Sequence, residues 1–306
     1  VPSVLRYGDD GVEAVGLIHR EVKVAKASFE ILLDGHLSAS GVVVDRRGLA
    51  LSSDHIFGHK TSVMEARSAD IGRAPLEVVA RDPGHDLVLL RLPRRAGGYA
   101  SVAIASRSPA LGADVYLVGS AMYRHGLFFK GSIARMAPTY EYLAQRGHYA
   151  RVLHISGTTP PGTSGGAWLD TRGRLVGIQS GLVHNEDIPV GLGYMSPRSA
   201  IKHLLRVKRD VVTPTIGLGV EELWEQPADF IARFPKFRAG LVVRKLMPGG
   251  PAIKAGIREG DLITAVSETP VKTRDEFLTL VRGVSSGGTL GLTIQRADGS
   301  NKAYEI

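Results

Sequence analysis

The chain contains no cysteine among its 306 residues. Disulfide bonds, thiolate metal sites and a cysteine nucleophile are therefore excluded. Aromatic residues make up 6% of the sequence, and basic residues exceed acidic ones by 8. The basic residues are scattered, whereas a nucleic-acid-binding surface gathers them in a stripe or patch. We therefore expect no nucleic-acid partner.

Long apolar runs are also missing. No stretch approaches the roughly 20 apolar residues that a membrane-spanning helix needs. The opening residues, VPSVLRYGDD, lack the charged start and apolar middle of a signal peptide. The sequence starts without methionine, so we expect a processed or trimmed chain. Membrane association is expected only through an N-terminal segment missing from this sequence.

The hydrophobic pattern divides the chain into two domains. Up to residue 208, short apolar runs such as DLVLLRL alternate with Gly, Asp and Arg turns, which predicts many short strands in a sandwich or barrel. Residues 209–214 end in a proline and form the expected linker. Residues 215–306 mix predicted strands with helices. The predicted fold is therefore mainly β, with a large domain at 1–208 and a smaller one after the linker.

Two helices are predicted from their boundary signals. One runs from Pro197 to Val207, with proline at its start and apolar residues on one face. The other, TRDEFLTLVRGV, begins at a capping box formed by Thr273 and Glu276. Its apolar residues follow directly after the box.

The stretch TPPGTSGGAWLD (159–170) places a serine among glycines, which are poor core material. A serine hydroxyl becomes a nucleophile only beside a base and near N–H groups that stabilise an oxyanion. Ser164 is the candidate nucleophile, and the amides of Gly162 and Ser164 can point into one pocket. A Gly- and Ser-rich hairpin turn without chemistry is the alternative interpretation.

The base is expected to be one of the ten histidines. His55 is the candidate because it follows the predicted hairpin GVVVDRRGLALSS, where a strand ends at a rim and fixes a side chain rigidly. His59 lies four residues further on, but HIFGH lacks the glutamate of a zinc-protease helix and carries Gly58. We therefore predict no metal, and we expect no cofactor.

A carboxylate at the start of a buried strand should orient the histidine. Asp86 directly precedes the apolar run LVLL, and an ionised group carried inward needs a partner such as a histidine N–H. Asp82 stands before a proline and is interpreted as a turn residue, so Asp86 is preferred. The order His55, Asp86, Ser164 is that of chymotrypsin-type proteases, and a β-rich chain fits the barrels on which that order occurs.

Several blocks of the sequence resemble the HtrA/Deg (Do-like) serine proteases. They are SASGVVVDRRGLALSSDHIF, RDPGHDLVLLRL, PPGTSGGAWLDTRGRLVGIQSGL and GLGYMSPRSAIKHLL. A later region, GLVVRKLMPGGPAIKAGIREGDLITAVSETPVKTRDEFLTLV, is similar to the PDZ domain of that family. The resemblance implies a chymotrypsin-like double β-barrel (1–208) followed by an α+β PDZ domain (215–306).

The same resemblance implies a function and a setting. Members of this family carry out ATP-independent proteolysis of unfolded or misfolded proteins, and we expect this activity here. The resemblance also implies C-terminal peptides as partners of the PDZ domain and assembly as a homotrimer. It further implies an extracytoplasmic location, in the periplasm or cell envelope, or an organellar lumen.

Residue by residue, the resemblance implies that His55 is the general base, Asp86 orients it and Ser164 attacks. The amides of Gly162 and Ser164, with Thr163 between them, would form the oxyanion hole. Substrate backbone would pair with Ile178, Gln179, Ser180 and Gly181. A peptide C-terminal carboxylate would bind the PDZ loop formed by Thr215, Ile216, Gly217 and Leu218.

The sequence departs from the family at a few positions. Thr163 replaces the usual asparagine before the serine, and Ala167 replaces the usual proline after the two glycines. These changes leave a catalytically inactive or latent PDZ scaffold, or a chaperone, as the alternative function. No carboxylate lies in SGTTPPG, just upstream of the serine, to pair with a basic substrate residue. Family analogy then favours a small or medium apolar residue before the scissile bond.

Residues 137–147, APTYEYLAQRG, are longer and more polar than a hairpin needs. The matching region of the family senses activating peptides. We hypothesise that this segment is mobile and couples peptide binding to activity. An ordinary surface loop is the alternative.

Overall fold

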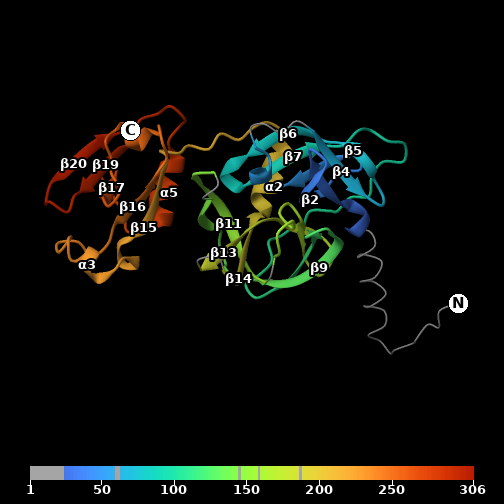
Figure 1. Ribbon diagram of the computed structural model, residues 1–306, viewed down its shortest axis with the longest axis horizontal. Helices are drawn as coiled ribbons and strands as arrows, with labels where there is room; N and C mark the ends of the chain where they lie inside the picture. Colours follow the sequence, from blue (N-terminus) through green and yellow to red (C-terminus); the bar gives the residue numbers. More distant parts are fainter. Residues whose placement is uncertain (1–23, 59–62, 144–145, 158, 186–187) are drawn as a thin grey trace. The chain divides into compact units, whose positions relative to one another are not determined.

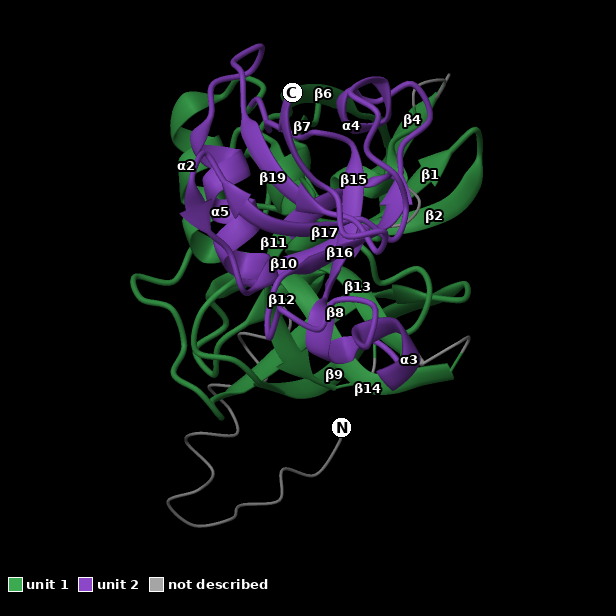
Figure 2. Ribbon diagram, turned by 90° about the vertical axis from the view of Figure 1, so that its left-hand side faces the viewer, with its two compact units in different colours: residues 1–138, 151–211 green, residues 139–150, 212–306 purple. Residues whose placement is uncertain are grey.

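The structure is a computed structural model, and it describes residues 24–58, 63–143, 146–157, 159–185 and 188–306 (Figure 1). The chain divides into two compact units (Figure 2): unit 1 comprises 1–138 and 151–211, and unit 2 comprises 139–150 and 212–306. Strands dominate both units, which confirms the mainly β fold class. Among the described residues, no helix is long and apolar enough to cross a membrane.

The first sheet of unit 1 contains the predicted hairpin that precedes His55. Its two strands, β2 (His36–Val43) and β3 (Leu49–Ser52), meet at a tight turn in which the Gly48 N–H donates to the Asp45 carbonyl over 2.9 Å. The sheet has seven strands, paired antiparallel. In spatial order they are β5 (Gly72–Pro75), β4 (Met64–Ser68), β1 (Ser28–Leu33), β2 (His36–Val43), β3 (Leu49–Ser52), β7 (Leu87–Arg91) and β6 (Glu77–Asp82).

The second sheet also has seven strands, and it curls into a barrel. Strand β11 pairs with β14 on one side and with β9 on the other, where Ile155 lies opposite Ile133, and this second pairing closes the barrel. In spatial order the strands are β10 (Thr139–Leu143), β11 (His148–Ser156), β14 (Ile188–Pro197), β13 (Leu175–Asn185), β12 (Ala167–Leu169), β8 (Asp114–Ala121) and β9 (Arg124–Ile133).

One apolar core joins the two sheets of unit 1. It contains Leu51 and Leu89 from the first sheet, Val118 and Ile178 from the second, and Ile201 from helix α2 (Arg198–Val207). All five side chains are fully buried. Helix α2 confirms the predicted helix to within one residue. Because the core is closely packed, it holds the facing ends of the two sheets at a fixed separation, and the candidate catalytic residues stand at those ends.

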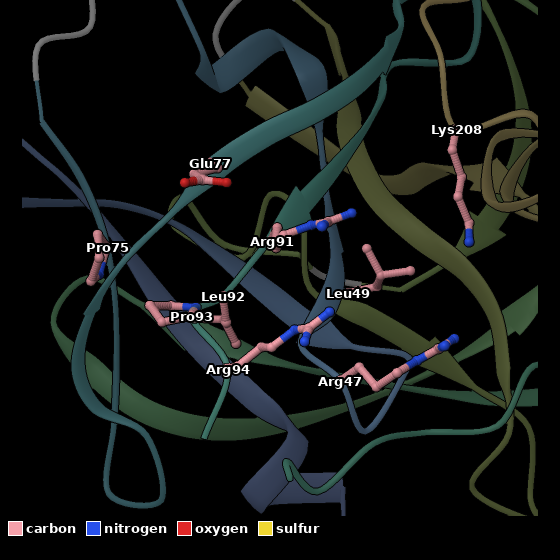
Figure 3. A pocket seen from close by; sticks show the side chains of 9 residues that line it. All are labelled: Arg47, Leu49, Pro75, Glu77, Arg91, Leu92, Pro93, Arg94 and Lys208. Atoms are coloured by element: carbon pink, nitrogen blue, oxygen red, sulfur yellow. The ribbon is translucent and has the colours of Figure 1, made fainter. Parts of the chain in front are cut away.

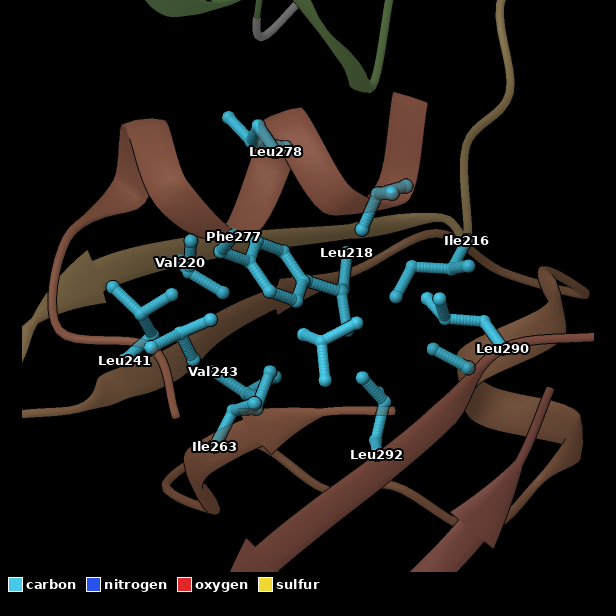
Figure 4. Packing of buried hydrophobic residues seen from close by; sticks show 14 of the residues in the cluster. Ile216, Leu218, Val220, Leu241, Val243, Ile263, Phe277, Leu278, Leu290 and Leu292 are labelled. Carbon is cyan, nitrogen blue, oxygen red and sulfur yellow. The ribbon is translucent and has the colours of Figure 1, made fainter. Parts of the chain in front are cut away.

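Unit 2 is a sheet covered by helix α5 (Arg274–Gly283). Phe277 of α5 is fully buried in the apolar cluster shown in Figure 4, together with Leu218 and Val243 of the sheet. The sheet order is β15 (Leu218–Glu222), β16 (Leu241–Leu246), β17 (Leu262–Val266), β19 (Gly291–Gln295) and β20 (Asn301–Glu305), and β18 (Thr269–Pro270) pairs with β17. Short helices η3 (Leu223–Glu225), α3 (Ala228–Ile231) and α4 (Pro251–Lys254) lie in the connections.

The capping box predicted for α5 is confirmed. The Glu276 N–H donates to the Thr273 hydroxyl over 3.3 Å, and the Thr273 N–H donates to the Glu276 carboxylate over 3.1 Å. The Lys272 N–H donates to the same carboxylate, and these backbone hydrogen bonds lower the pKa of Glu276. The box therefore satisfies backbone N–H groups that the helix itself leaves without partners.

Unit 2 also contains the hairpin made by β10 and the first residues of β11, residues 139–150. Tyr140 and Tyr149 of this hairpin belong to the same apolar cluster as Phe277. A segment from within the range 1–208 therefore packs with residues that follow the expected linker. The hypothesised mobile region includes β10, and two of its residues, 144–145, lie outside the described part of the chain.

Candidate active site

His55 is held in place by Asp86. The histidine lies in the short helix η1 (Asp54–Ile56), directly after β3, and its backbone N–H donates to Asp86 Oδ1 over 2.7 Å. Its ring Nδ1 is 2.7 Å from Asp86 Oδ2. Because an ionised carboxylate only accepts, Nδ1 carries a proton, and Nε2 of the neutral ring is left as an acceptor. That Nε2 is 3.2 Å from Ser164 Oγ.

Asp86 is carried inward as predicted from its position before β7. It caps helix η2 (Pro83–His85) in the left-handed conformation, with φ of 51°, and its side chain is 1% exposed. A buried carboxylate needs several partners. Besides the two groups of His55, the Ser180 hydroxyl donates to Asp86 Oδ2. The backbone of Asp86 is held separately, because the Ser196 hydroxyl donates to its main-chain carbonyl over 3.2 Å. The structure thus places Ser180, a predicted substrate contact, against the aspartate.

Asp82 does not join the candidate triad. It precedes η2, where its turn interpretation placed it, but it is fully buried and its Oδ2 lies 2.9 Å from Nδ1 of His85. Two Asp–His pairs therefore lie a few residues apart, and of these two the pair with Asp86 reaches a serine. His59, which was set aside as a metal ligand, lies outside the described residues. Within the described ranges, no group of three His, Asp or Glu side chains could hold a metal ion.

A tight turn shapes the backbone before Ser164. The Thr163 N–H donates to the Pro160 carbonyl over 3.2 Å, Pro161 occupies the second position, and Gly162 has φ of +97°. These are the features of a type II turn, which favours glycine at its third position. The Thr163 hydroxyl also donates to the Pro160 carbonyl, over 2.7 Å, so the residue that replaces asparagine supports the turn.

The carbonyl groups of this loop are held on the side away from the candidate oxyanion hole. The Met122 N–H donates to the Pro161 carbonyl over 3.3 Å, and the Gly166 N–H donates to the Thr163 carbonyl over 2.8 Å. In a trans peptide the C=O and N–H groups point in opposite directions. The N–H groups of Gly162 and Ser164, which share peptides with these two carbonyls, are therefore aimed the other way. Neither has a hydrogen-bond partner within the described chain.

Ser40 of β2 holds the loop from the first sheet, and nothing in the sequence singled it out. Its hydroxyl donates to the Gly162 carbonyl over 3.0 Å and accepts from the Ser120 N–H over 2.9 Å, while its own N–H donates to the Ser164 carbonyl over 2.8 Å. The side chain is 1% exposed. Gly165, with φ of +81°, lets the loop come this close, because a Cβ there would collide with Ser52 Oγ and the Ser40 carbonyl.

The remaining predicted substrate contacts lie in β13. Ile178 is fully buried, and Gln179 uses its side chain to accept from the Trp168 indole over 2.7 Å and to donate to the Gly181 carbonyl over 3.0 Å. The pairing of β13 with β14 shifts register between Gln179 and Gly181. This irregularity turns the intervening Ser180 out of the regular ladder, so that its hydroxyl reaches the aspartate and its carbonyl lies 3.4 Å from Ser164 Oγ.

The predicted carboxylate-binding loop leads directly into the edge strand of unit 2. Leu218 begins β15, and the Gly217 N–H donates to the Thr215 hydroxyl over 3.2 Å. The carbonyls of Ile216 and Gly217 accept from the N–H groups of Ala252 and Met247. The loop is thus tied to the segment around α4.

A separate hollow of about 350 Å³ lies in unit 1 (Figure 3). Arg47, Arg91, Arg94 and Lys208 line it together with Glu77, so part of the excess positive charge gathers there. None of the candidate catalytic residues lines this hollow.

Two protein families match the chain. Residues 39–178 match the trypsin-like peptidase domain, and residues 214–306 match the PDZ domain. The fold and these matches define the class of the protein: a trypsin-like peptidase domain joined to a PDZ domain.

Curated relatives are named as serine proteases, and the chain spans between about half and three quarters of their lengths. Serine protease PepD of Mycobacterium tuberculosis is 24% identical over 289 residues, covering 87% of this chain and 60% of PepD. Serine endoprotease DegS of Escherichia coli is 27% identical over 267 residues, covering 85% of this chain and 73% of DegS. A probable periplasmic serine endoprotease, DegP-like, of Brucella suis is 25% identical over 273 residues, covering 87% of this chain and 51% of the relative.

Solved structures share the fold. The serine endoprotease from Yersinia pestis matches 100% of this chain and 97% of its own, with a TM-score of 0.61 and 22% identity. The HtrA-type protease AlgW, solved with a tripeptide, gives a TM-score of 0.64 with 20% identity, over 95% of this chain and 95% of its own. The chain thus contains a trypsin-like peptidase domain followed by a PDZ domain, and it is similar to serine proteases that include PepD and DegS.

Proposed function

We propose that this chain is an ATP-independent serine endopeptidase in which His55, Asp86 and Ser164 form the catalytic triad. The observation that carries the proposal is the unbroken path from a buried carboxylate through an imidazole to a hydroxyl, with 2.7 Å and 3.2 Å between the successive atoms. The side chain of His55 is 27% exposed, whereas that of Asp86 is 1% exposed. The base can therefore reach a substrate while its partner stays away from water.

In the proposed mechanism, Ser164 Oγ bonds to the substrate carbonyl carbon as its proton moves to His55 Nε2. The imidazolium is stabilised by Asp86, which accepts from Nδ1 throughout. The oxyanion is stabilised by the N–H groups of Gly162 and Ser164. The carbonyls of the same two peptides are held on the opposite side by hydrogen bonds from the N–H groups of Met122 and Gly166. His55 then returns the proton to the leaving amine, and water hydrolyses the acyl-enzyme by the same steps in reverse order.

The domain bounds, substrates, assembly and location are proposed from the resemblance to the HtrA/Deg proteases. The protease domain would span residues 1–208, the linker 209–214 and the PDZ domain 215–306. Unfolded or misfolded proteins would be the substrates, a homotrimer the assembly, and the periplasm or cell envelope the location, which agrees with the name of the DegP-like relatives. We further propose that the loop Thr215–Leu218 receives the C-terminal carboxylate of a peptide that adds a strand beside β15.

A fluorophosphonate probe tests the catalytic proposal directly. Such a probe reacts only with a serine activated by a base beside an oxyanion hole, so we expect stoichiometric labelling of the wild-type chain and none of Ser164→Ala. Peptide mapping should place the label on Ser164. Absence of labelling, even with denatured protein present, would favour the alternative of a PDZ scaffold or chaperone.

Ser40→Ala should lower kcat about 10-fold or more with little change in KM. Without the Ser40 hydroxyl, the Gly162 carbonyl loses its hydrogen bond, and the loop that forms the proposed oxyanion hole is less firmly held. Ser40 would then be a positioning residue that acts through the loop. The matched control is Ser52→Ala, which removes a buried hydroxyl that donates to the Ser40 carbonyl over 2.8 Å. Peptide hydrolysis and thermal unfolding should be measured on both variants. Equal kcat values in variants of equal stability would contradict the role of Ser40.

A further inference from the structure

The open edge of β15 is the place where a bound peptide would add a strand. Within the described chain, β15 pairs with β16 alone and forms one end of its sheet. Helix α5 borders the same edge, with Asp275, Leu278 and Arg282 spaced along one face of the helix. A strand bound here would need the backbone N–H and C=O groups of β15 as hydrogen-bond partners.

Those backbone groups are already used by a tyrosine of the β10–β11 hairpin. The Tyr149 hydroxyl accepts from the Val220 N–H over 2.8 Å and donates to the Val220 carbonyl over 3.0 Å. One hydroxyl thus replaces both bonds that a residue of an added strand would make. Tyr149 is 4% exposed, and burial raises the pKa of its hydroxyl to about 12, so the donor proton is retained at neutral pH.

Other residues of the hairpin are hydrogen-bonded to helix α5, which borders the same edge of β15. Asp275 accepts from the Thr139 hydroxyl over 2.7 Å and from the Tyr140 N–H over 3.3 Å. At the other end of this helix face, the Arg282 guanidinium donates to the Tyr149 carbonyl. The hairpin is therefore held by the strand and by both ends of the helix.

Aromatic rings fill the space between these anchors. Tyr142 packs edge-on against Tyr149, with ring centroids 5.1 Å apart, and lies so close to Gly219 of β15 that a Cβ there would be 3.3 Å from its ring. Tyr140 and Tyr149 share the apolar cluster with Leu278 of α5. The hairpin thus makes hydrogen bonds to the backbone of β15 and buries apolar rings between β15 and α5. A bound peptide strand would make these same two kinds of contact.

We propose that the β10–β11 hairpin occupies the peptide-binding groove of the PDZ domain, between β15 and α5, through its residues 139–143 and 146–150. A peptide with a free C-terminal carboxylate and apolar last residues then binds only by displacing the hairpin. The proposal rests on the peptide-binding site proposed above. Its consequence is quantitative: the apparent dissociation constant equals the intrinsic one divided by the fraction of molecules whose groove is empty. Weakening the hairpin must therefore tighten peptide binding without changing any groove residue.

The test uses fluorescence anisotropy with a fluorescein-labelled Gly- and Ser-rich octapeptide ending in Leu-Val-Phe, and its C-terminal amide as the control peptide. Tyr149→Phe keeps the ring but loses both hydrogen bonds to Val220, so the carboxylate peptide should bind about 5- to 50-fold more tightly than to wild type. Thr139→Val, which frees the other end of the hairpin, should act in the same direction. Tyr304→Phe loses a hydroxyl that accepts from Arg296 elsewhere in unit 2 and should match wild type.

A second measurement reads the hairpin itself. In chain labelled with carbon-13 at the tyrosine Cζ, the Tyr149 signal should move at neutral pH when peptide is added, because displacement removes both hydrogen bonds between its hydroxyl and Val220. Equal peptide affinity of wild type, Tyr149→Phe and Thr139→Val, or a Tyr149 signal that saturating peptide leaves unmoved, would overturn the displacement. If none of the chains prefers the carboxylate peptide to the amide, the peptide site of the proposed function is refuted with it. Fluorophosphonate labelling of Ser164 stays an independent measure of the protease proposal.

Discussion

Asp86→Asn is expected to lower kcat/KM for a protein substrate about 10,000-fold, the loss that follows when a serine protease histidine is held in the wrong tautomer. The asparagine would keep the shape of the side chain, and its oxygen could still accept from the His55 backbone N–H. Its amide NH₂, however, would donate toward Nδ1 and move the ring proton to Nε2. That nitrogen could then no longer accept the proton of Ser164.

The matched control is Asp82→Asn, because Asp82 is also buried and also pairs with a histidine a few residues away. This change should leave kcat/KM within a few-fold of wild type, provided that thermal unfolding shows the variant to be folded. Hydrolysis of a denatured protein and fluorophosphonate labelling should be measured in parallel. Full activity of Asp86→Asn, or equal losses in both variants of equal stability, would mean that Asp86 does not orient the base.

Phe277→Ala is expected to destabilise unit 2 by about 3–5 kcal/mol, the usual cost of removing a fully buried phenylalanine and leaving a cavity. The ring is 0% exposed and belongs to a cluster with Leu218, Val220 and Ile263 (Figure 4). The apolar clusters of unit 1 do not include it. Unfolding of unit 2 should therefore shift to lower temperature or denaturant concentration.

Differential scanning calorimetry and urea titration measure the effect of this substitution. Thr279→Ala is the control, since Thr279 lies on the same helix but is exposed, and a substitution there should change stability by no more than about 0.5 kcal/mol. A loss below about 1 kcal/mol for Phe277→Ala would show that the cluster does not carry the stability of unit 2.

The sequence alone indicated the features that depend on local patterns. The alternation of short apolar runs predicted a mainly β chain, the proline at 197 predicted the start of α2, and Thr273 with Glu276 predicted the cap of α5. The three candidate triad residues could be proposed because each stands at a recognisable boundary: after a hairpin, before a buried strand, or in a glycine-rich turn. Each of these signals lies within a few residues of the position that it marks.

The contacts that the sequence did not indicate are all long-range. Ser40 reaches Gly162 across 122 positions, and Ser196 reaches Asp86 across 110. Short strands of similar composition give no sign of which serine will face which loop, because strand order and register decide this. The docking of Tyr149 on Val220 is of the same kind: the alternation of the hairpin predicts a strand but not its partner.

The β8–β9 turn places two residues where glycine or asparagine would be expected. Ala121 and Arg124 pair across a two-residue connection, and Met122 and Tyr123 between them have φ of 46° and 62°. Each left-handed side-chain residue costs on the order of 1 kcal/mol. That conformational strain is tolerated at the turn whose Met122 amide fixes the peptide before Gly162. The hairpin end is thus less stable by itself than an Asn-Gly turn would be, and its Met122 N–H donates to the carbonyl of Pro161, the residue before Gly162.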